Sequence, residues 1–130
     1  MAKEQLKNKG KNKMDYNADN VFAKILRGEI PCKKIYEDDH ALAFYDINPK
    51  AKIHALVICK ALLTDYSDFI NHADEHEITG FMRAIAKTVE ILGVEEDGYR
   101  LVFNKGINGG QEVPHLHAHI LGGEKLSTNL

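Results

Sequence analysis

The sequence predicts an α+β domain, in which an antiparallel sheet carries helices on one face. Three observations lead to this fold class: short apolar segments separated by turn residues, a long amphipathic segment at 74–92, and an alternating segment at 113–121. The 130 residues suffice for one domain, and the chain shows neither an internal repeat nor a linker rich in proline, glycine or serine. We therefore expect a single domain over 19–130, with five strands and two helices.

Two segments have helical spacing. The shorter begins at Asp19 or Asn20, either of which can cap a helix that runs to Arg27, and Gly28 supplies a left-handed terminator. The longer covers 74–92 and places its apolar residues three and four positions apart, on one side. This stripe is predicted to face the core and consists of Ile78, Phe81, Met82, Ile85, Val89 and Leu92.

Five segments have the composition and bounds of strands. The first two are joined by a short acidic turn and form a hairpin, and a glycine-rich loop over 104–111 separates the last two. Hairpins and adjacent strands favour antiparallel pairing throughout the sheet. The predicted strands are 34–37, 41–46, 54–59, 99–103 and 113–121.

The composition excludes several classes of protein. With 44% apolar and 28% charged residues the chain can form a core, and its longest purely apolar run, 55–59, is far too short for a membrane helix. The N-terminus lacks the apolar segment of a secretory signal, so we expect a cytoplasmic protein without a membrane partner. In that compartment Cys32 and Cys59 are expected to be thiols.

The charge is unevenly distributed along the chain. Five lysines and one glutamate give residues 1–13 a net charge of +4, whereas the remainder, with 12 basic and 18 acidic residues, carries −6. Residues 1–18 are therefore predicted to form a disordered, lysine-rich tail. Such a tail could bind nucleic acid or could simply be solvated. Because residues 1–13 lack arginine and aromatic residues, and because the body is acidic, we expect no nucleic-acid partner.

The most informative segment is the last predicted strand, where histidines alternate with apolar residues. Alternate side chains of a strand point to the same face, so His115, His117 and His119 are predicted to form a row on one face. Leu116 and Ala118, between them, would face the core. Burying three imidazoles without partners costs free energy and does not help the chain to fold, so the row indicates a functional site.

Two kinds of chemistry would use such a row. In the first, the imidazoles bind a metal ion such as zinc, although no carboxylate or cysteine close in the sequence completes the site. In the second, one neutral imidazole attacks phosphorus and its neighbours bind the anion. The glycine-rich loop favours the second chemistry, because its backbone N–H groups can approach a phosphate and Asn104 and Gln111 can donate hydrogen bonds to it. A plain turn would explain the loop equally well.

The alternating histidines resemble the signature of the histidine triad (HIT) nucleotide-binding proteins. The segment from Gly109 to Gly123, which contains them, is similar to the Hint branch of that family. The similarity extends over most of the chain, from Asp19 to Gly123, in separate blocks that occur in the same order. These blocks include residues 22–25, 28–31, 36–39, 43–49 and 51–54.

The resemblance implies a HIT-like fold, with a five-stranded antiparallel sheet and two helices, and a homodimer whose sheets join into ten strands. It also implies a purine nucleotide site with AMP or GMP as the product, in which apolar residues enclose the base and Asp46 accepts hydrogen bonds from the ribose. The residues that match the nucleotide-binding positions are Val21, Phe22, Ile25, Phe44, Asp46, Ile47, Asn104, Gly110, Gln111, Glu112 and Val113.

The resemblance also assigns roles to the histidines. It implies that His117 attacks the α-phosphorus to give a nucleotidyl-histidine, that His119 binds phosphate, and that His54 and His115 support the nucleophile. Glu112 stands where the eukaryotic Hint proteins have a serine near the leaving group. No cofactor and no metal are expected, because the implied chemistry requires no metal. A structural zinc is not expected near the first helix either, because Asn20 and Ala23 replace the Cys-x-x-Cys pair of many bacterial members.

The expected function follows from this resemblance. We expect a nucleotide hydrolase, similar to an adenosine phosphoramidase, that cleaves the bond between a nucleoside 5′-monophosphoryl group and its leaving group. Two alternatives stay open at this point: a hydrolase of dinucleoside polyphosphates or acyl-nucleotides, and a regulatory protein that binds nucleotide with incidental turnover.

Overall fold

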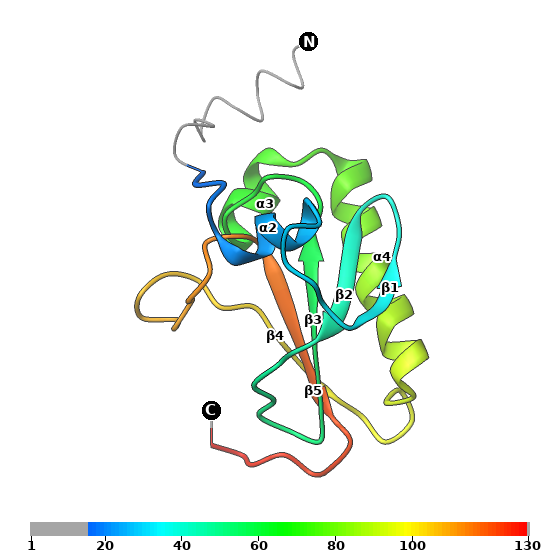
Figure 1. The fold of residues 1–130 in the computed structure, drawn as a ribbon. Coiled ribbons are helices and arrows are strands. Elements are labelled where there is room, and N and C mark those ends of the chain that lie inside the picture. The colour runs from blue at the N-terminus through cyan, green and yellow to red at the C-terminus, as the bar shows by residue number, and fades with distance from the viewer. Residues whose placement is uncertain (1–15, 130) are drawn as a thin grey trace.

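The computed structural model describes residues 16–129, so residues 1–15 of the predicted tail lie outside the described part of the chain. The remaining tail residues, 16–18, are hydrogen-bonded to the start of the domain: the Arg27 side chain donates to the Ala18 carbonyl (2.9 Å) and Asn20 donates to the Asn17 carbonyl (2.8 Å). The elements, in chain order (Figure 1), are α2 (Val21–Leu26), β1 (Lys34–Glu37), β2 (Ala41–Tyr45), β3 (Ile53–Cys59), α3 (Tyr66–His72), α4 (Glu75–Leu92), β4 (Arg100–Val102) and β5 (His117–Gly122).

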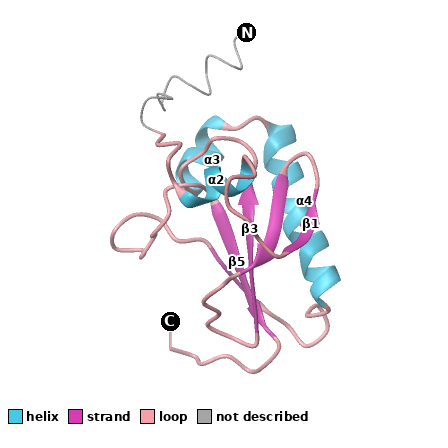
Figure 2. Ribbon diagram, viewed as in Figure 1, coloured by secondary structure: helices cyan, strands magenta, loops and turns pink. Residues whose placement is uncertain are grey.

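The strands of residues 16–129 form one five-stranded sheet in the order β1-β2-β3-β5-β4. Every neighbouring pair is antiparallel. Strands β3 and β5 therefore lie side by side in the middle of the sheet although they are far apart in the sequence (Figure 2). The predicted α+β class and the five-stranded antiparallel sheet are confirmed.

Helix α4 begins and ends at the residues that the sequence indicates. The Asp74 side chain accepts the Glu77 backbone N–H (2.8 Å), and the Glu77 side chain accepts the Asp74 N–H (3.1 Å), which forms a capping box. Gly93 ends the helix in the left-handed conformation, with φ of 72°. Most of the predicted apolar stripe packs on the sheet, whereas Met82 is 40% exposed. No helix within residues 16–129 combines the length and apolar character needed to cross a bilayer.

The helices cover both faces of the sheet, which corrects the expectation that they share one face. Helices α3 and α4 pack on the face formed by the small residues Ala41, Ala43 and Ala55. Helix α2 packs on the opposite face through Phe22, which contacts residues such as Phe44. The reason lies in the strands: four successive residues of β2 and six of β3 are buried, so both of their faces need cover.

Two further elements differ from the prediction. Helix α3 was not predicted, because it has only seven residues and Phe69 is its one fully buried apolar side chain. The final strand begins at His117 instead of residue 113, since bends occupy residues 113–115. Pro114 has no N–H to contribute to a sheet, and the His115 N–H donates to the Val113 carbonyl (2.8 Å) in a tight turn. His115 therefore lies outside the strand.

Candidate active site

Two of the three histidines in the predicted row lie on one strand. His117 and His119 occupy alternate positions of β5, so their side chains project from the same face of the sheet. Their ring centroids are 5.1 Å apart. The register with β3 places Ile58 opposite His117 and Leu56 opposite His119, on the face covered by α2. These two imidazoles are therefore neighbours, as the alternation predicts.

His115 reaches the site by a different route. It precedes β5, and its side chain is fully buried between the end of β3 and the start of the domain. The His115 Nε2–H donates to the Cys59 carbonyl (2.5 Å), and the ring lies 6.4 Å from that of Phe22. Burial lowers the pKa of His115 to about 4, so the ring is neutral at pH 7. The strand pleat therefore does not place this histidine; its turn and its hydrogen bonds do.

The hydrogen bond of His117 determines which of its nitrogens is free. Its Nδ1 lies 2.6 Å from the backbone carbonyl of His115. A carbonyl only accepts hydrogen bonds, so Nδ1 carries the proton and Nε2 of the neutral ring keeps its lone pair. Burial lowers the pKa of His117 below its usual value, although the same carbonyl and Asp46 act in the opposite direction. His117 is therefore a neutral imidazole with an unprotonated Nε2.

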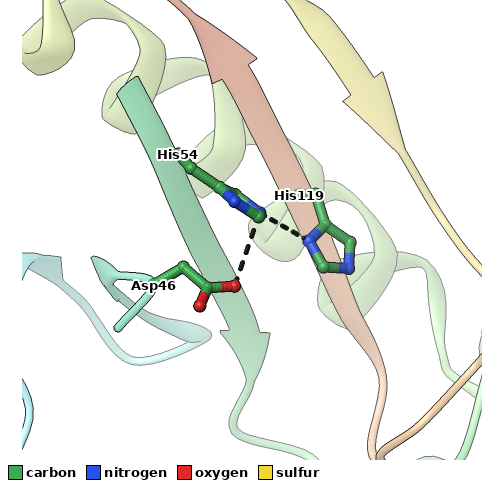
Figure 3. A group of neighbouring side chains, drawn as sticks. All are labelled: Asp46, His54 and His119. Atoms are coloured by element: carbon green, nitrogen blue, oxygen red, sulfur yellow. Dashed lines mark hydrogen bonds and ion pairs between the residues drawn. The ribbon is translucent and has the colours of Figure 1, made fainter. Parts of the chain in front are cut away.

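A second hydrogen-bonded chain orients His119 (Figure 3). The Lys50 backbone N–H donates to Nδ1 of His54 (3.0 Å), so the proton of the neutral His54 ring is on Nε2. This Nε2–H of His54 donates to Nδ1 of His119 (2.9 Å), and the Asp46 carboxylate lies 3.4 Å from Nε2 of His54. His119 consequently carries its proton on Nε2. Burial, with His117 and His54 nearby, lowers the pKa of His119 to about 4, which makes it a neutral hydrogen-bond donor.

The group formed by Asp46, His54 and His119 also has the ligand types and the spacing that could hold a metal ion. Their ligand atoms all lie within 4.8 Å of one another. However, the backbone N–H of Lys50 occupies one nitrogen of His54, and the other nitrogen holds the proton shared with His119. A metal ion at this position would have to displace that proton and break the hydrogen bond. The hydrogen bonding therefore favours the phosphorus chemistry of the row over the metal chemistry.

A hollow of about 320 Å³ opens beside the two strand histidines. Its walls come from α2, from the end of β2 and from the segment before β5. Sequence reasoning missed five wall residues: Ile30, Pro31 and Cys32 in the turn between α2 and β1, Tyr45 at the end of β2, and Leu56 on β3. Of the predicted site residues, the hollow is lined by Val21, Phe22, Ile25, Phe44, Asp46, Ile47, Asn104, Gly110, Glu112, Val113, His117 and His119.

Gln111 is the one predicted nucleotide-binding residue outside these walls. Its amide nitrogen donates to the carbonyls of Thr64 (2.8 Å) and Val113 (3.0 Å), so both amide hydrogens are used within the protein. Its amide oxygen accepts the Gly106 N–H (3.2 Å). Asn104 donates to the Gly109 carbonyl (2.7 Å) and still lines the hollow. In this structure Gln111 holds the glycine-rich loop in place, and Asn104 borders the space itself.

A second hollow, of about 560 Å³, adjoins the first. The two hollows share Asp46, Asn104, Glu112 and His119, so they meet at these four residues. Its remaining walls are formed by His54 and by residues of the turn before β3 and of β4 and β5. The histidines thus lie between an apolar space and a more polar one.

The fold and the site together define a class of small α+β proteins that hold neutral imidazoles of one strand beside an apolar hollow. The model of the HIT domain family matches residues 27–126. The chain therefore belongs to the HIT domain family, which confirms the resemblance seen in its histidines.

Individual relatives match over nearly their whole length. An uncharacterized 13.2 kDa HIT-like protein of Azospirillum brasilense is 52% identical over 111 residues, which are 85% of this chain and 91% of the relative. A purine nucleoside phosphoramidase of Escherichia coli (strain K12) is 41% identical over 112 residues, 86% of this chain and 93% of the relative. The structure of a HIT family hydrolase from Clostridium thermocellum has a TM-score of 0.78 at 38% identity, and the match covers 88% of this chain and 98% of that one.

Proposed function

We propose that this protein is a purine nucleotide hydrolase that cleaves the bond between a nucleoside 5′-monophosphoryl group and its leaving group through a nucleotidyl-histidine. The observation that carries the proposal is the neutral His117, whose Nδ1–H is held by a carbonyl and whose Nε2 is therefore free to attack. The similarity to the E. coli protein named purine nucleoside phosphoramidase supports the purine and the reaction type.

The first hollow suits a nucleoside monophosphate. Phe22 and Phe44, with ring centroids 6.0 Å apart, provide apolar surface for a purine base, and Asp46 can accept hydrogen bonds from ribose hydroxyls. The α-phosphate would then lie beside His117, which lines the hollow. Its Nδ1 is hydrogen-bonded to a carbonyl, whereas its Nε2 has no hydrogen-bond partner among the described residues. The volume of about 320 Å³ lies within the usual range for ligand pockets.

The histidines divide the chemistry between them. Nε2 of His117 attacks the α-phosphorus and forms a P–N bond, while the bond to the leaving group breaks and the leaving group departs with its electron pair. The Nε2–H of His119 donates to a phosphoryl oxygen and stabilises the charge that develops there. Water then attacks phosphorus, the P–N bond breaks and His117 regains its lone pair. Overall, one water is consumed: its OH ends on phosphorus and its other hydrogen on the leaving group.

The second hollow provides space for the leaving group. It meets the first hollow at Asp46, Asn104, Glu112 and His119, next to the position proposed for the α-phosphate. A phosphoramidate, whose leaving group is an amine, is our first choice of substrate, by similarity to the phosphoramidase. A dinucleoside polyphosphate or an acyl-nucleotide would also fit a space of about 560 Å³ and is the alternative.

A substrate panel combined with adduct trapping tests this proposal. The panel compares kcat/KM for a purine nucleoside phosphoramidate, a dinucleoside polyphosphate and an acyl-adenylate. The reaction with the best substrate is then quenched rapidly, without acid, and the protein is analysed by mass spectrometry. We expect the phosphoramidate to give the highest value and the nucleotidyl group to be found on His117. Turnover without an adduct on His117 would contradict the mechanism. Tight binding of nucleotide with no turnover of any substrate would support the regulatory alternative.

We also propose that the protein is a homodimer that pairs along β4. This strand is at an edge of the sheet, and Tyr99 and Leu101 expose apolar surface there. The other edge strand, β1, carries charged Lys34 and Glu37, which discourage pairing. Light scattering is expected to give twice the chain mass of 14.6 kDa, and a mass of one chain at micromolar concentration would refute the dimer.

A further inference from the structure

Tyr16, from the segment before α2, contacts His115, the fully buried histidine of the site. The Tyr16 hydroxyl is hydrogen-bonded to Nδ1 of His115, and the two rings pack edge to face with centroids 5.7 Å apart. Tyr16 and His115 are 99 residues apart in the sequence. The contact therefore ties the beginning of the domain to the residue that precedes β5.

The direction of each hydrogen bond around Tyr16 follows from its partners. His115 donates its Nε2–H to the Cys59 carbonyl, so Nδ1 of the neutral ring can only accept and Tyr16 must donate. The Tyr16 oxygen in turn accepts from the side-chain amide of Asn20 (3.1 Å), whose own oxygen caps α2 by accepting the Ala23 N–H (2.9 Å). Burial raises the pKa of Tyr16, so the hydroxyl keeps its proton.

This chain of hydrogen bonds ends at the proposed nucleophile. The backbone carbonyl of His115 accepts the Nδ1–H of His117 and thereby leaves Nε2 of His117 free. Because His115 lies in a turn outside β5, the hydrogen bonds of the sheet do not hold its backbone. Its ring is instead held at both nitrogens, by Cys59 on one side and by Tyr16 on the other. Removing the Tyr16 hydroxyl would leave a buried acceptor unpaired and one of these two constraints missing.

We propose that Tyr16 is a positioning residue of the active site: by holding His115, it fixes the carbonyl that keeps Nε2 of His117 unprotonated. This inference rests on the proposed function, in which His117 is the nucleophile. Tyr16 lines neither hollow and therefore does not take part in the reaction itself. Its effect is therefore expected in kcat and not in nucleotide binding.

The test is Tyr16→Phe in the full-length chain, which removes the hydroxyl and keeps the ring. With purine nucleoside phosphoramidate we expect kcat to fall about 10-fold and KM to change less than twofold, because a small displacement of a reacting group slows the chemical step. Nitrogen-15 NMR of the imidazoles gives a second readout that does not depend on turnover. The wild type is expected to show His117 protonated on Nδ1, and Tyr16→Phe a mixture of the two tautomers.

A matched control removes a tyrosine hydroxyl elsewhere. Tyr36 on β1 donates to the Asp38 carboxylate (2.8 Å), so Tyr36→Phe also deletes one side-chain hydrogen bond but leaves the histidines untouched. We expect wild-type kcat and tautomers for this variant. A second variant, Asn20→Ser, keeps an oxygen that can cap α2 and removes the amide that holds the Tyr16 hydroxyl. We expect its kcat to fall about threefold, in the same direction as Tyr16→Phe.

Several outcomes would overturn the inference. Wild-type kcat and an unchanged His117 tautomer in Tyr16→Phe would do so, as would equal losses in Tyr16→Phe and Tyr36→Phe, which would indicate general destabilisation. In both cases the proposed function survives as long as the trapped adduct is on His117. If no adduct forms on His117, the proposed function fails instead, and the NMR comparison still decides whether Tyr16 sets the tautomer of that residue.

Discussion

The two faces of the sheet are built from alternate residues of the same strands, yet within residues 16–129 only one of them carries histidines. On the α4 face, small residues of β2 and β3 let an 18-residue helix pack closely over the sheet. On the other face, larger residues pack under α2, which has only six residues. At 1.5 Å per residue these helices are about 27 Å and about 9 Å long. The short helix leaves part of its face uncovered, and the hollow with His117 and His119 occupies that part.

Neighbouring residues of β5 therefore have separate tasks. His117 and His119 face the hollow, whereas Ala118 and Ile120 are fully buried under α4. The buried histidines of residues 16–129, which are His54, His115 and His117, all belong to the α2 side. The comparison suggests that chemistry and stability can be changed independently by substituting adjacent residues, and the predictions that follow test this separation.

The largest effect is expected from His117→Ala. Loss of the nucleophile should lower kcat at least ~10³-fold, while nucleoside monophosphate still binds. Single-turnover kinetics and calorimetry would measure both quantities. The exposed His76 of α4 provides the matched control, and His76→Ala should retain normal turnover. Normal turnover by His117→Ala would disprove the mechanism.

The second prediction concerns the α4 face. Ile120 is fully buried, so Ile120→Ala should destabilise the protein by about 2–5 kcal/mol through lost burial and the cavity it leaves. Urea unfolding would measure this loss, and kcat per folded molecule should change less than twofold. Ile70→Ala on α3, where the side chain is 43% exposed, should cost less than about 0.5 kcal/mol. If Ile120→Ala removed activity from folded protein, the two faces would not be independent.

The sequence predicts well those features that depend on local patterns. The spacing of apolar residues locates α4, and Asp74 and Gly93 mark its ends as the structure has them. Alternation places His117 and His119 on one face of β5. In each case the determining interactions lie within a few residues of one another, so a short window contains the necessary information.

Features that depend on distant contacts could not be derived in this way. The position of His115 follows from the turn at Pro114 and from Cys59 and Tyr16, which lie 56 and 99 residues away. Phe22 and Phe44 are 7% and 4% exposed and have the pattern of ordinary core residues, so only the family resemblance distinguished them as candidate base-binding residues. The placement of α2 opposite α4 likewise depends on which face remains to be covered, and the local pattern does not contain that information.

The smallest expected effect is the loss in the free energy of unfolding when the pH is lowered, which should come from the face that holds the buried histidines. His115 is fully buried and its pKa is lowered to about 4, whereas in the unfolded chain it is about 6.5. Between these values the unfolded chain binds a proton at this residue and the folded protein does not, so the free energy of unfolding decreases as the pH falls. The stability that depends on a neutral His115 is fully present above about pH 6.5, and about 2 kcal/mol of the free energy of unfolding should be lost at this residue between pH 7 and pH 5.

Substituting the buried histidine isolates this contribution. His115→Gln has no titrating ring, so its free energy of unfolding should change by about 2 kcal/mol less than that of the wild type between pH 7 and pH 5, even though the variant is less stable at both. Most carboxylates stay ionised in this interval, and the α4 face, with no buried histidine among the described residues, should contribute little. Urea unfolding at the two pH values measures the difference. Equal losses in wild type and His115→Gln would show that folding does not lower the pKa of His115, so that its ring takes up a proton in the folded protein as readily as in the unfolded chain, and the hydrogen bond that Tyr16 donates to it could then not exist as described.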